Sequence, residues 1–167
     1  MTGRPRNIIP PGPGQESVWD YPRPPAFSPD DRLVTVVLDG EEIARSGGTI
    51  RILETSHPPT FYIPPGDVRV ERLEASPHTS FCEFKGQAIY FNLRAGDRHI
   101  EAAAWCYPDP SPGYGSIAGF FAFYPNKVDR CTVDGRIVVP QPGEFYGGWI
   151  TPDVVGPFKG EPGTMAW

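Results

Sequence analysis

Short runs of β-branched and aromatic residues, separated by Gly, Pro and Asp, recur along most of the chain. Residues 32–38 read RLVTVVL and end at Asp39-Gly40, a dipeptide that favours a two-residue hairpin turn. Residues 41–46 would return antiparallel, and residues 49–54 read TIRILE with apolar side chains at alternate positions. The pattern therefore predicts three consecutive strands that form a meander.

A polar turn at residues 94–97 divides two further β-type runs in the middle of the chain. The first run covers residues 79–93 and the second covers residues 98–107, so the pattern predicts a central hairpin. A hairpin brings its two ends together, and the side chains with the most chemistry lie at these ends. They are Cys82, Glu83, Lys85, Trp105 and Tyr107.

Composition limits the remaining structure to short elements. The 22 Pro and 19 Gly residues interrupt almost every window in which a long helix would form. Residues 67–73, which read DVRVERL, give the best helix candidate, of two turns at most. We therefore expect a mainly β, compact single domain with one or two short helices and long Pro/Gly-rich loops.

One domain is expected to follow a short arm. The segment Pro10-Pro11-Gly12-Pro13-Gly14 supplies few N–H donors and favours polyproline-like geometry, so residues 1–15 are expected to form a flexible N-terminal arm. Residues 16–167 contain the aromatic and β-branched residues that a core needs, and this length suits a single domain.

Charge and hydropathy exclude several classes of function. The net charge of −5 gives no support for a basic face that would bind nucleic acid. No apolar run reaches the ~18–20 residues of a transmembrane helix, and the N-terminus lacks the apolar segment of a secretory signal. Three cysteines without paired spacing suit reduced thiols, so we expect a cytoplasmic protein. Nothing in the sequence specifies an oligomeric state.

The spacing of cysteine and histidine argues against a metal site. Structural zinc in small β domains needs close pairs of Cys or His ligands. No two of the three cysteines are close in sequence, and His57, His78 and His99 are isolated from one another. We expect neither a metal ion nor a cofactor.

Cys82 is a candidate nucleophile. Lys85 lies close to it in sequence and its positive charge favours a thiolate, while Glu54 or His57 would supply a base. Glu83 with Lys85 forms a second candidate pair for catalysis. The alternative is that Cys82 is an unreactive core residue, since buried Cys is common.

Aromatic residues are numerous enough to line a binding site. A concave site lined by rings with a few polar groups would suit a small ligand. Trp105 and Tyr107 would supply the rings, and Glu54, His57 and Lys85 would supply the polar contacts. An ordinary aromatic core is the alternative explanation.

Six motifs occur in a fixed order along nearly the whole chain. They are ESVWDYPRPP (16–25), LETSHPPTFYIPPGDV (53–68), FCEFKGQAIYF (81–91), AAWCYPDP (103–110), AFYPNKV (122–128) and YGGWITPDVVGPFKGEPGT (146–164). Together they resemble the domain of unknown function 427 family over residues 16–167. The resemblance implies a β-tent-like fold of two antiparallel sheets, similar to methionine-R-sulfoxide reductases and the thalidomide-binding domain of cereblon.

The resemblance leaves the chemistry open. Those relatives typically carry zinc held by two Cys-x-x-Cys pairs, which this chain lacks, so the metal is not carried over. A nucleotidyltransferase-like label is sometimes attached to the family, but the carboxylate and Gly-Ser signature of such enzymes is absent. Three hypotheses remain: small-molecule binding in an aromatic-lined cleft, a small-molecule enzyme that uses Cys82 or Glu83 with Lys85, and a structural or protein-interaction domain.

Overall fold

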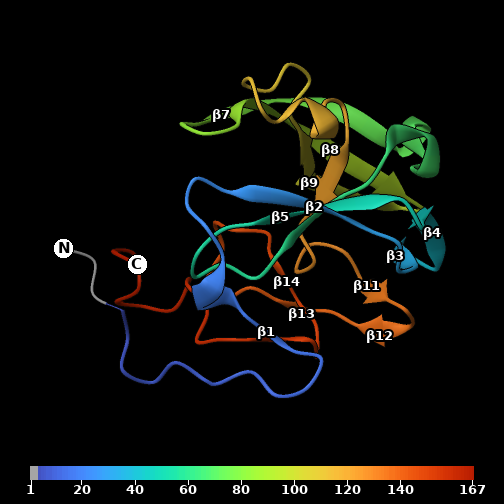
Figure 1. Cartoon of the computed structure of the whole chain (residues 1–167). Coiled ribbons are helices and arrows are strands. Elements are labelled where there is room, and N and C mark those ends of the chain that lie inside the picture. Colours follow the sequence, from blue (N-terminus) through green and yellow to red (C-terminus); the bar gives the residue numbers. More distant parts are fainter. Residues whose placement is uncertain (1–3) are drawn as a thin grey trace.

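The computed structural model describes residues 4–167, and short β-strands supply almost all of its regular structure (Figure 1). The strands in this range are β1 (Glu16–Ser17), β2 (Ala26–Asp30), β3 (Val34–Leu38), β4 (Glu41–Ser46), β5 (Thr49–Leu53), β6 (Thr60–Tyr62), β7 (Leu73–Cys82), β8 (Gly86–Ala95), β9 (Arg98–Cys106), β10 (Phe121–Phe123), β11 (Arg130–Val133), β12 (Arg136–Ile137), β13 (Val139–Pro140), β14 (Trp149–Ile150) and β15 (Val154–Val155). Short 3₁₀ turns lie at Val18–Asp20, Pro65–Asp67, Val70–Arg72 and Gly115–Ile117, and no helix among the described residues is long and apolar enough to cross a membrane. The mainly β prediction is therefore confirmed.

Antiparallel pairing dominates the sheets. One four-stranded sheet has the order β10-β9-β8-β7, and a second has the order β12-β11-β3-β4. The three-stranded sheet β2-β5-β6 joins the first through mutual backbone hydrogen bonds between Ile63 and Phe121, with N–O distances of 2.8 and 2.9 Å. The longer strands therefore form two principal antiparallel surfaces, supplemented by the short ribbons β1-β15 and β13-β14.

Two Asp-Gly dipeptides form tight hairpin turns. Asp39 and Gly40 have φ angles of 52° and 74° between β3 and β4, and Asp134 and Gly135 have φ angles of 48° and 78° between β11 and β12. Positive φ at both central residues is typical of a type I′ turn, whose twist matches that of the flanking strands. The predicted hairpin of β3 and β4 is confirmed.

The predicted meander is wrong at its third strand. β5 pairs with β2 and β6 rather than with β4. Alternation along residues 49–54 sets which side chains share a face, but not which strand is the partner. Arg51 favours the observed pairing, because its buried side chain needs carboxylates, and Asp30 of β2 and Glu16 of β1 supply them.

The predicted helix over residues 67–73 is also wrong. Two separate 3₁₀ turns, Pro65–Asp67 and Val70–Arg72, occupy this stretch, and β7 begins at Leu73. Between the turns Val68 is buried in an extended conformation and forms a β-bridge with Ala44. Pairing with β4 therefore outweighs the weak helix propensity of so short a segment.

The central hairpin contains one more turn than the sequence pattern predicts. The run over residues 79–93 belongs to two strands, because β7 ends at Cys82 and β8 begins at Gly86. Gly86 has a φ of 105°, a conformation that glycine adopts readily and other residues rarely do. The result is a meander β7-β8-β9, in which Trp105 of β9 pairs with Tyr90 of β8.

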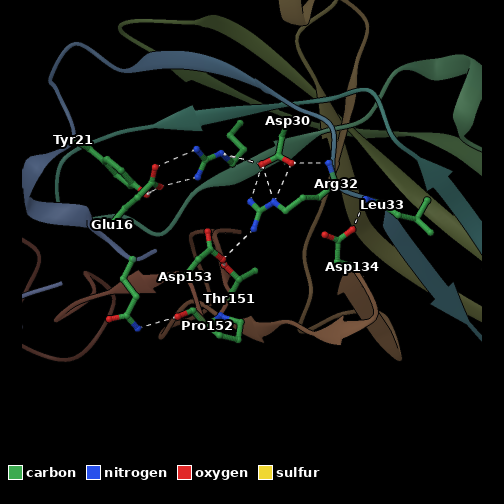
Figure 2. A network of polar contacts seen from close by, with 11 residues as sticks. Glu16, Tyr21, Asp30, Arg32, Leu33, Asp134, Thr151, Pro152 and Asp153 are labelled. Carbon is green, nitrogen blue, oxygen red and sulfur yellow. Dashed lines mark hydrogen bonds and ion pairs between the residues drawn. The ribbon is translucent and has the colours of Figure 1, made fainter. Parts of the chain in front are cut away.

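An ion-pair network ties both ends of the chain to the pair of strands β2 and β5 (Figure 2). Arg51 Nη1 lies 2.9 Å from Glu16 Oε1, and Arg51 Nε lies 3.3 Å from Asp30 Oδ2. Arg32 pairs with Asp30 and, at 3.1 Å, with Asp153 of the C-terminal segment. Burial alone would raise the pKa of Asp30, but the hydrogen bonds from Arg32 and the positive charges of Arg32 and Arg51 together outweigh burial and lower that pKa. The network therefore fixes the C-terminal segment beside the sheet.

Besides a minor cluster of Val18, Trp19, Tyr21 and Val154, two main apolar clusters lie against the sheets. The larger one includes Phe61 and Trp149, whose rings stack with their centroids 4.9 Å apart. The smaller one is mainly aromatic and consists of Ile52, Tyr62, Ala88, Trp105, Tyr107, Tyr114, Ile117, Ala122 and Tyr124. Trp105 and Tyr107, which the sequence assigned to a pocket or to a core, belong to this smaller cluster.

The predicted N-terminal arm lies only partly within the described residues. Residues 1–3 fall outside them, and residues 4–15 form no strand or helix. The Ile9 N–H donates to the Gly156 carbonyl at 3.0 Å, and Gln15 Nε2 donates to the Pro152 carbonyl at 3.0 Å. A flexible arm over residues 1–15 and a single domain over residues 16–167 remain predictions.

Candidate functional site

A cavity of about 300 Å³ lies beside the aromatic cluster. Its wall comes from the β5–β6 loop, β6, the β7–β8 turn, β8, β9 and the C-terminal segment after β13. Every side chain that was predicted from the sequence as a site residue lines this cavity: Glu54, His57, Cys82, Glu83, Lys85, Trp105 and Tyr107. The structure thus brings the whole predicted set together, although Glu83 remains exposed to solvent.

Tight turns hold the predicted polar residues at the ends of strands. Glu54 directly follows β5, and its carbonyl accepts a hydrogen bond from the His57 N–H at 3.0 Å, which closes a turn. Lys85 lies in the turn between β7 and β8, and its carbonyl accepts from the Ser111 N–H at 2.8 Å. Backbone hydrogen bonds therefore position both turns beside the cavity.

Tyr62, Trp105 and Tyr124 form much of the aromatic wall. Trp105 Nε1 donates to Tyr62 Oη at 3.2 Å, and the ring centroids of Trp105 and Tyr124 lie 4.6 Å apart. Burial raises the pKa of Tyr62 and of Tyr107, so both phenols stay protonated at neutral pH. The wall therefore offers aromatic rings and neutral hydroxyl groups to the cavity.

Gly147 lets the C-terminal segment approach Trp105 closely. A Cβ atom at Gly147 would lie 2.4 Å from Trp105 Cη2 and 3.1 Å from Tyr124 Cδ1, closer than carbon atoms normally pack. The next residue, Gly148, donates its N–H to Gln141 Oε1 at 3.0 Å. The absence of a side chain at Gly147 thus allows the backbone to lie against the indole and complete the cavity wall.

Gln141 determines which nitrogen of His57 carries a proton. Gln141 Oε1 accepts from the Gly148 N–H, and Gln141 Nε2 donates to the Lys159 carbonyl at 2.9 Å, so the orientation of the amide is fixed. The same Nε2 lies 3.0 Å from His57 Nδ1, which must therefore act as the acceptor. The proton of the neutral imidazole resides on Nε2, 3.7 Å from Glu54 Oε2.

The surroundings of His57 keep its imidazole neutral. Burial, together with the positive charges of Lys159, Arg23 and Lys85, lowers the pKa of His57 from 6.5 to about 3. Glu54 would favour the charged form, but Arg23 Nη2 lies 3.4 Å from Glu54 Oε2 and already balances this carboxylate. Protonation of His57 Nδ1 would also place its N–H opposite the N–H of Gln141 Nε2, and two donors cannot form a hydrogen bond with each other. His57 therefore offers the cavity a neutral N–H donor at Nε2.

Lys85 and Lys159 line the cavity, and neither pairs with a side-chain carboxylate among residues 4–167. Lys85 Nζ lies 5.9 Å from the centre of the Tyr107 ring and forms neither an ion pair nor a hydrogen bond within that range. Lys159 is buried, and its Nζ lies 5.5 Å from the centre of the Tyr146 ring. The Lys159 ammonium donates to an oxygen of Trp167, the last residue of the sequence, at 3.1 Å. The lining therefore combines two ammonium groups with the carboxylates of Glu54 and Glu83.

Comparison with known families places most of this geometry in one recognised domain. A family model described as Domain of unknown function (DUF427) matches residues 26–134. The chain belongs to the DUF427 family. A search of curated proteins finds no match. All seven side chains that the sequence nominated lie within the range matched to DUF427, and the resemblance stated from the motifs is confirmed.

The segment beyond the DUF427 match supplies cavity residues that sequence reasoning missed. Gln141, Gly147 and Lys159 all line the cavity. The hydrogen bond from Gln141 to His57 joins residues 84 positions apart, which no local pattern predicts. The available signal was the sequence FYGGW at residues 145–149, which indicates close packing but does not name its partner.

Cys82 differs from the other two cysteines of the DUF427 chain in its access to the cavity. All three thiols are free, but only Cys82 is half-buried in the cavity wall. Burial raises the pKa of Cys106 and of Cys131, which keeps both thiols protonated. Within residues 4–167 no group of three or more His, Cys, Asp or Glu side chains is placed to hold a metal ion. The site can offer ring stacking, N–H donors and one thiol.

Proposed function

We propose that this DUF427 protein binds a small molecule in the cavity beside Trp105. The observation that carries the proposal is the convergence of Glu54, His57, Lys85, Trp105 and Tyr107, from separate parts of the chain, on one hollow. A purely structural cluster would pack these side chains against one another, because protein interiors are close-packed and hold few voids larger than a water molecule.

The size and lining of the cavity support a small ligand. Its volume of about 300 Å³ falls at the lower end of the range of roughly 300–1,000 Å³ that is typical of ligand pockets. Trp105 and the neighbouring tyrosines provide ring surface, and His57 Nε2 provides a donor whose direction is fixed by Gln141. An apolar lining with a few oriented polar groups is the usual composition of a small-molecule site.

A second candidate function is catalysis by Cys82 in the same cavity. Its half-buried position in the wall means that a bound molecule would lie near the sulfur. The pair of Glu83 and Lys85 has less support, since Glu83 is exposed. If the protein converts a bound compound and Cys82→Ser abolishes that conversion, the protein is an enzyme rather than a binding protein.

Free thiols at all three cysteines also suit a reducing compartment, and we propose a cytoplasmic location.

Gly147→Ala tests the binding function without removing a polar group. A fragment screen by ligand-observed NMR identifies compounds that bind the wild-type protein, and calorimetry then gives their dissociation constants. The added methyl group must displace the indole of Trp105, so we expect binding to weaken at least tenfold, about 1.4 kcal/mol.

Gly115→Ala is the matched control for this experiment. A Cβ atom at Gly115 meets no atom within 4 Å, and its φ is not positive, so this variant should bind the same fragments as the wild type does. A Gly147→Ala variant that folds normally and keeps wild-type affinity for every fragment would contradict the proposed site.

A further inference from the structure

Two polar atoms of the cavity lining have no hydrogen-bond partner. His57 Nε2 and Tyr107 Oη form no hydrogen bond with residues 4–167, and neither is among the fully buried polar atoms that lack one. Both atoms are therefore open to the cavity, although Tyr107 is only 6% exposed and His57 is partly buried. Polar groups in such places ordinarily find a hydrogen-bond partner. A bound molecule would find its free hydrogen-bonding positions at these two atoms.

His57 acts only as a donor at Nε2. Gln141 Nε2 lies 3.0 Å from His57 Nδ1. Because the Gly148 N–H and the Lys159 carbonyl fix the Gln141 amide, His57 Nδ1 is the acceptor and the imidazole proton lies on Nε2. The lowered pKa of His57 keeps the imidazole neutral at neutral pH, so no second protonation state changes this arrangement. A group that binds at Nε2 must therefore accept a hydrogen bond.

The charges around His57 Nε2 favour an uncharged acceptor over an anion. Glu54 Oε2 lies 3.7 Å from His57 Nε2, which is too far for a hydrogen bond but close enough to repel an anion placed there. The two lysines of the lining are matched in number by its two glutamates, so the lining has no net formal charge for a ligand to neutralise. A carbonyl oxygen or a ring nitrogen meets these conditions, because each accepts a hydrogen bond and carries no charge.

We propose that the ligand is an uncharged aromatic compound that accepts a hydrogen bond from His57 Nε2, and that Gln141 sets this preference as a positioning residue. This inference rests on the proposed binding function and names its ligand class. The aromatic part packs beside Trp105, whose own N–H is already donated to the Tyr62 hydroxyl. Burial raises the pKa of Tyr107, so its hydroxyl stays neutral and serves a second polar atom of the ligand.

Four indane derivatives test this ligand class by NMR titration: 1-indanone, indane, indane-1-carboxylate and 1-aminoindane. They share the ring system, and the polar group is in turn a neutral acceptor, absent, an anion and a cation. We expect 1-indanone to bind about fivefold more tightly than indane, the effect of one neutral hydrogen bond, and more tightly than either charged probe. His57→Phe keeps an aromatic ring beside Tyr146 but removes the donor, so it should abolish the preference for the ketone over indane.

His78→Phe is the matched control for His57→Phe. The His78 ring also contacts a tyrosine, with its centroid 4.5 Å from that of Tyr90, just as the centroids of His57 and Tyr146 lie 4.6 Å apart. His78 does not line the cavity, so this variant should keep the wild-type preference for 1-indanone.

Nitrogen-15 NMR of the imidazole tests the positioning role of Gln141 directly. The wild type should show a protonated Nε2 and an unprotonated Nδ1 at His57. Gln141→Met removes the amide that faces Nδ1, so part of the proton should move to Nδ1 and the preference for the ketone should fall. The wild-type spectrum needs no substitution, so it tests the assigned tautomer even if Gln141→Met fails to fold.

The outcomes that would overturn the inference are distinct from failure of the proposed function. Equal binding of 1-indanone and indane, or tighter binding of a charged probe, would show that a neutral acceptor is not selected, while ligand binding itself would stand. Failure of all four probes, with fragments from the screen bound in the cavity, would have the same meaning. An unchanged preference in a folded His57→Phe variant would show that another donor holds the ketone.

The role of Gln141 would be contradicted by a protonated Nδ1 in the wild type, or by an unchanged imidazole spectrum in a folded Gln141→Met variant. The absence of any compound that binds in the cavity would contradict both the ligand class and the proposed function.

Discussion

Arg51→Met should lower the free energy of unfolding by about 3–5 kcal/mol, measured by urea unfolding at neutral pH. The Arg51 side chain is only 10% exposed and pairs with Glu16 and Asp30, whose own side chain is 8% exposed. Removal of the guanidinium leaves two carboxylates in the network with fewer partners (Figure 2). Uncompensated buried charge is among the most destabilising changes that a single substitution makes.

Arg45→Met is the matched control for this prediction. Arg45 also lies in a strand and pairs with Glu42 at 3.3 Å, but its side chain is 58% exposed. Exposed ion pairs contribute little, so we expect a change below about 1 kcal/mol. Similar losses of stability in the two variants would mean that burial does not govern the Arg51 network.

His57→Gln should make the protein less sensitive to mild acid. The unfolded chain takes up a proton at His57 below about pH 6.5, whereas the folded protein does so only near its lowered pKa of about 3. The unfolded state therefore binds more protons in this window, and wild-type stability falls as the pH falls. From about pH 6.5 to about pH 5, this residue alone should cost the wild type about 2 kcal/mol.

Urea unfolding at several pH values between those limits measures the effect as a difference in slope. Gln at position 57 retains an oxygen that can accept from Gln141, so the variant removes the titrating group while keeping an acceptor. His99→Gln, at an exposed position of β9, is the matched control and should keep the wild-type slope, because His57 is still present. Parallel pH profiles for the wild type and His57→Gln would contradict the assigned neutral state.

Local chemistry explains which features of the fold could be predicted from the sequence. The turn at Asp39-Gly40 could be predicted because few other dipeptides adopt positive φ at both positions. Two adjacent residues are therefore enough to specify it. The partner of β5 could not be predicted, since an alternating strand can pair with any neighbour. Arg51 selects β2 through Asp30, which is 21 positions away.

The same distinction applies to the candidate site. Glu54, Lys85 and Trp105 could be predicted as site residues because polar and aromatic side chains at strand ends tend to meet at the edge of a sheet. Gln141 and Lys159 could not, because long loops bring them to the cavity and an ion pair outside its lining, between Arg32 and Asp153, holds their segment beside the sheet. The sequence therefore predicted one half of the cavity and left its other wall undescribed.

The most direct test of the proposed binding site is the position of a bound compound, measured by an amide NMR titration with the tightest fragment from the screen. We expect the largest shifts to fall together on His57, Lys85, Trp105 and Tyr146, which come from four separate segments and line one cavity. Shifts confined to another surface, such as the open groove beside β2 and β5, would contradict it, as would the failure of every fragment to bind.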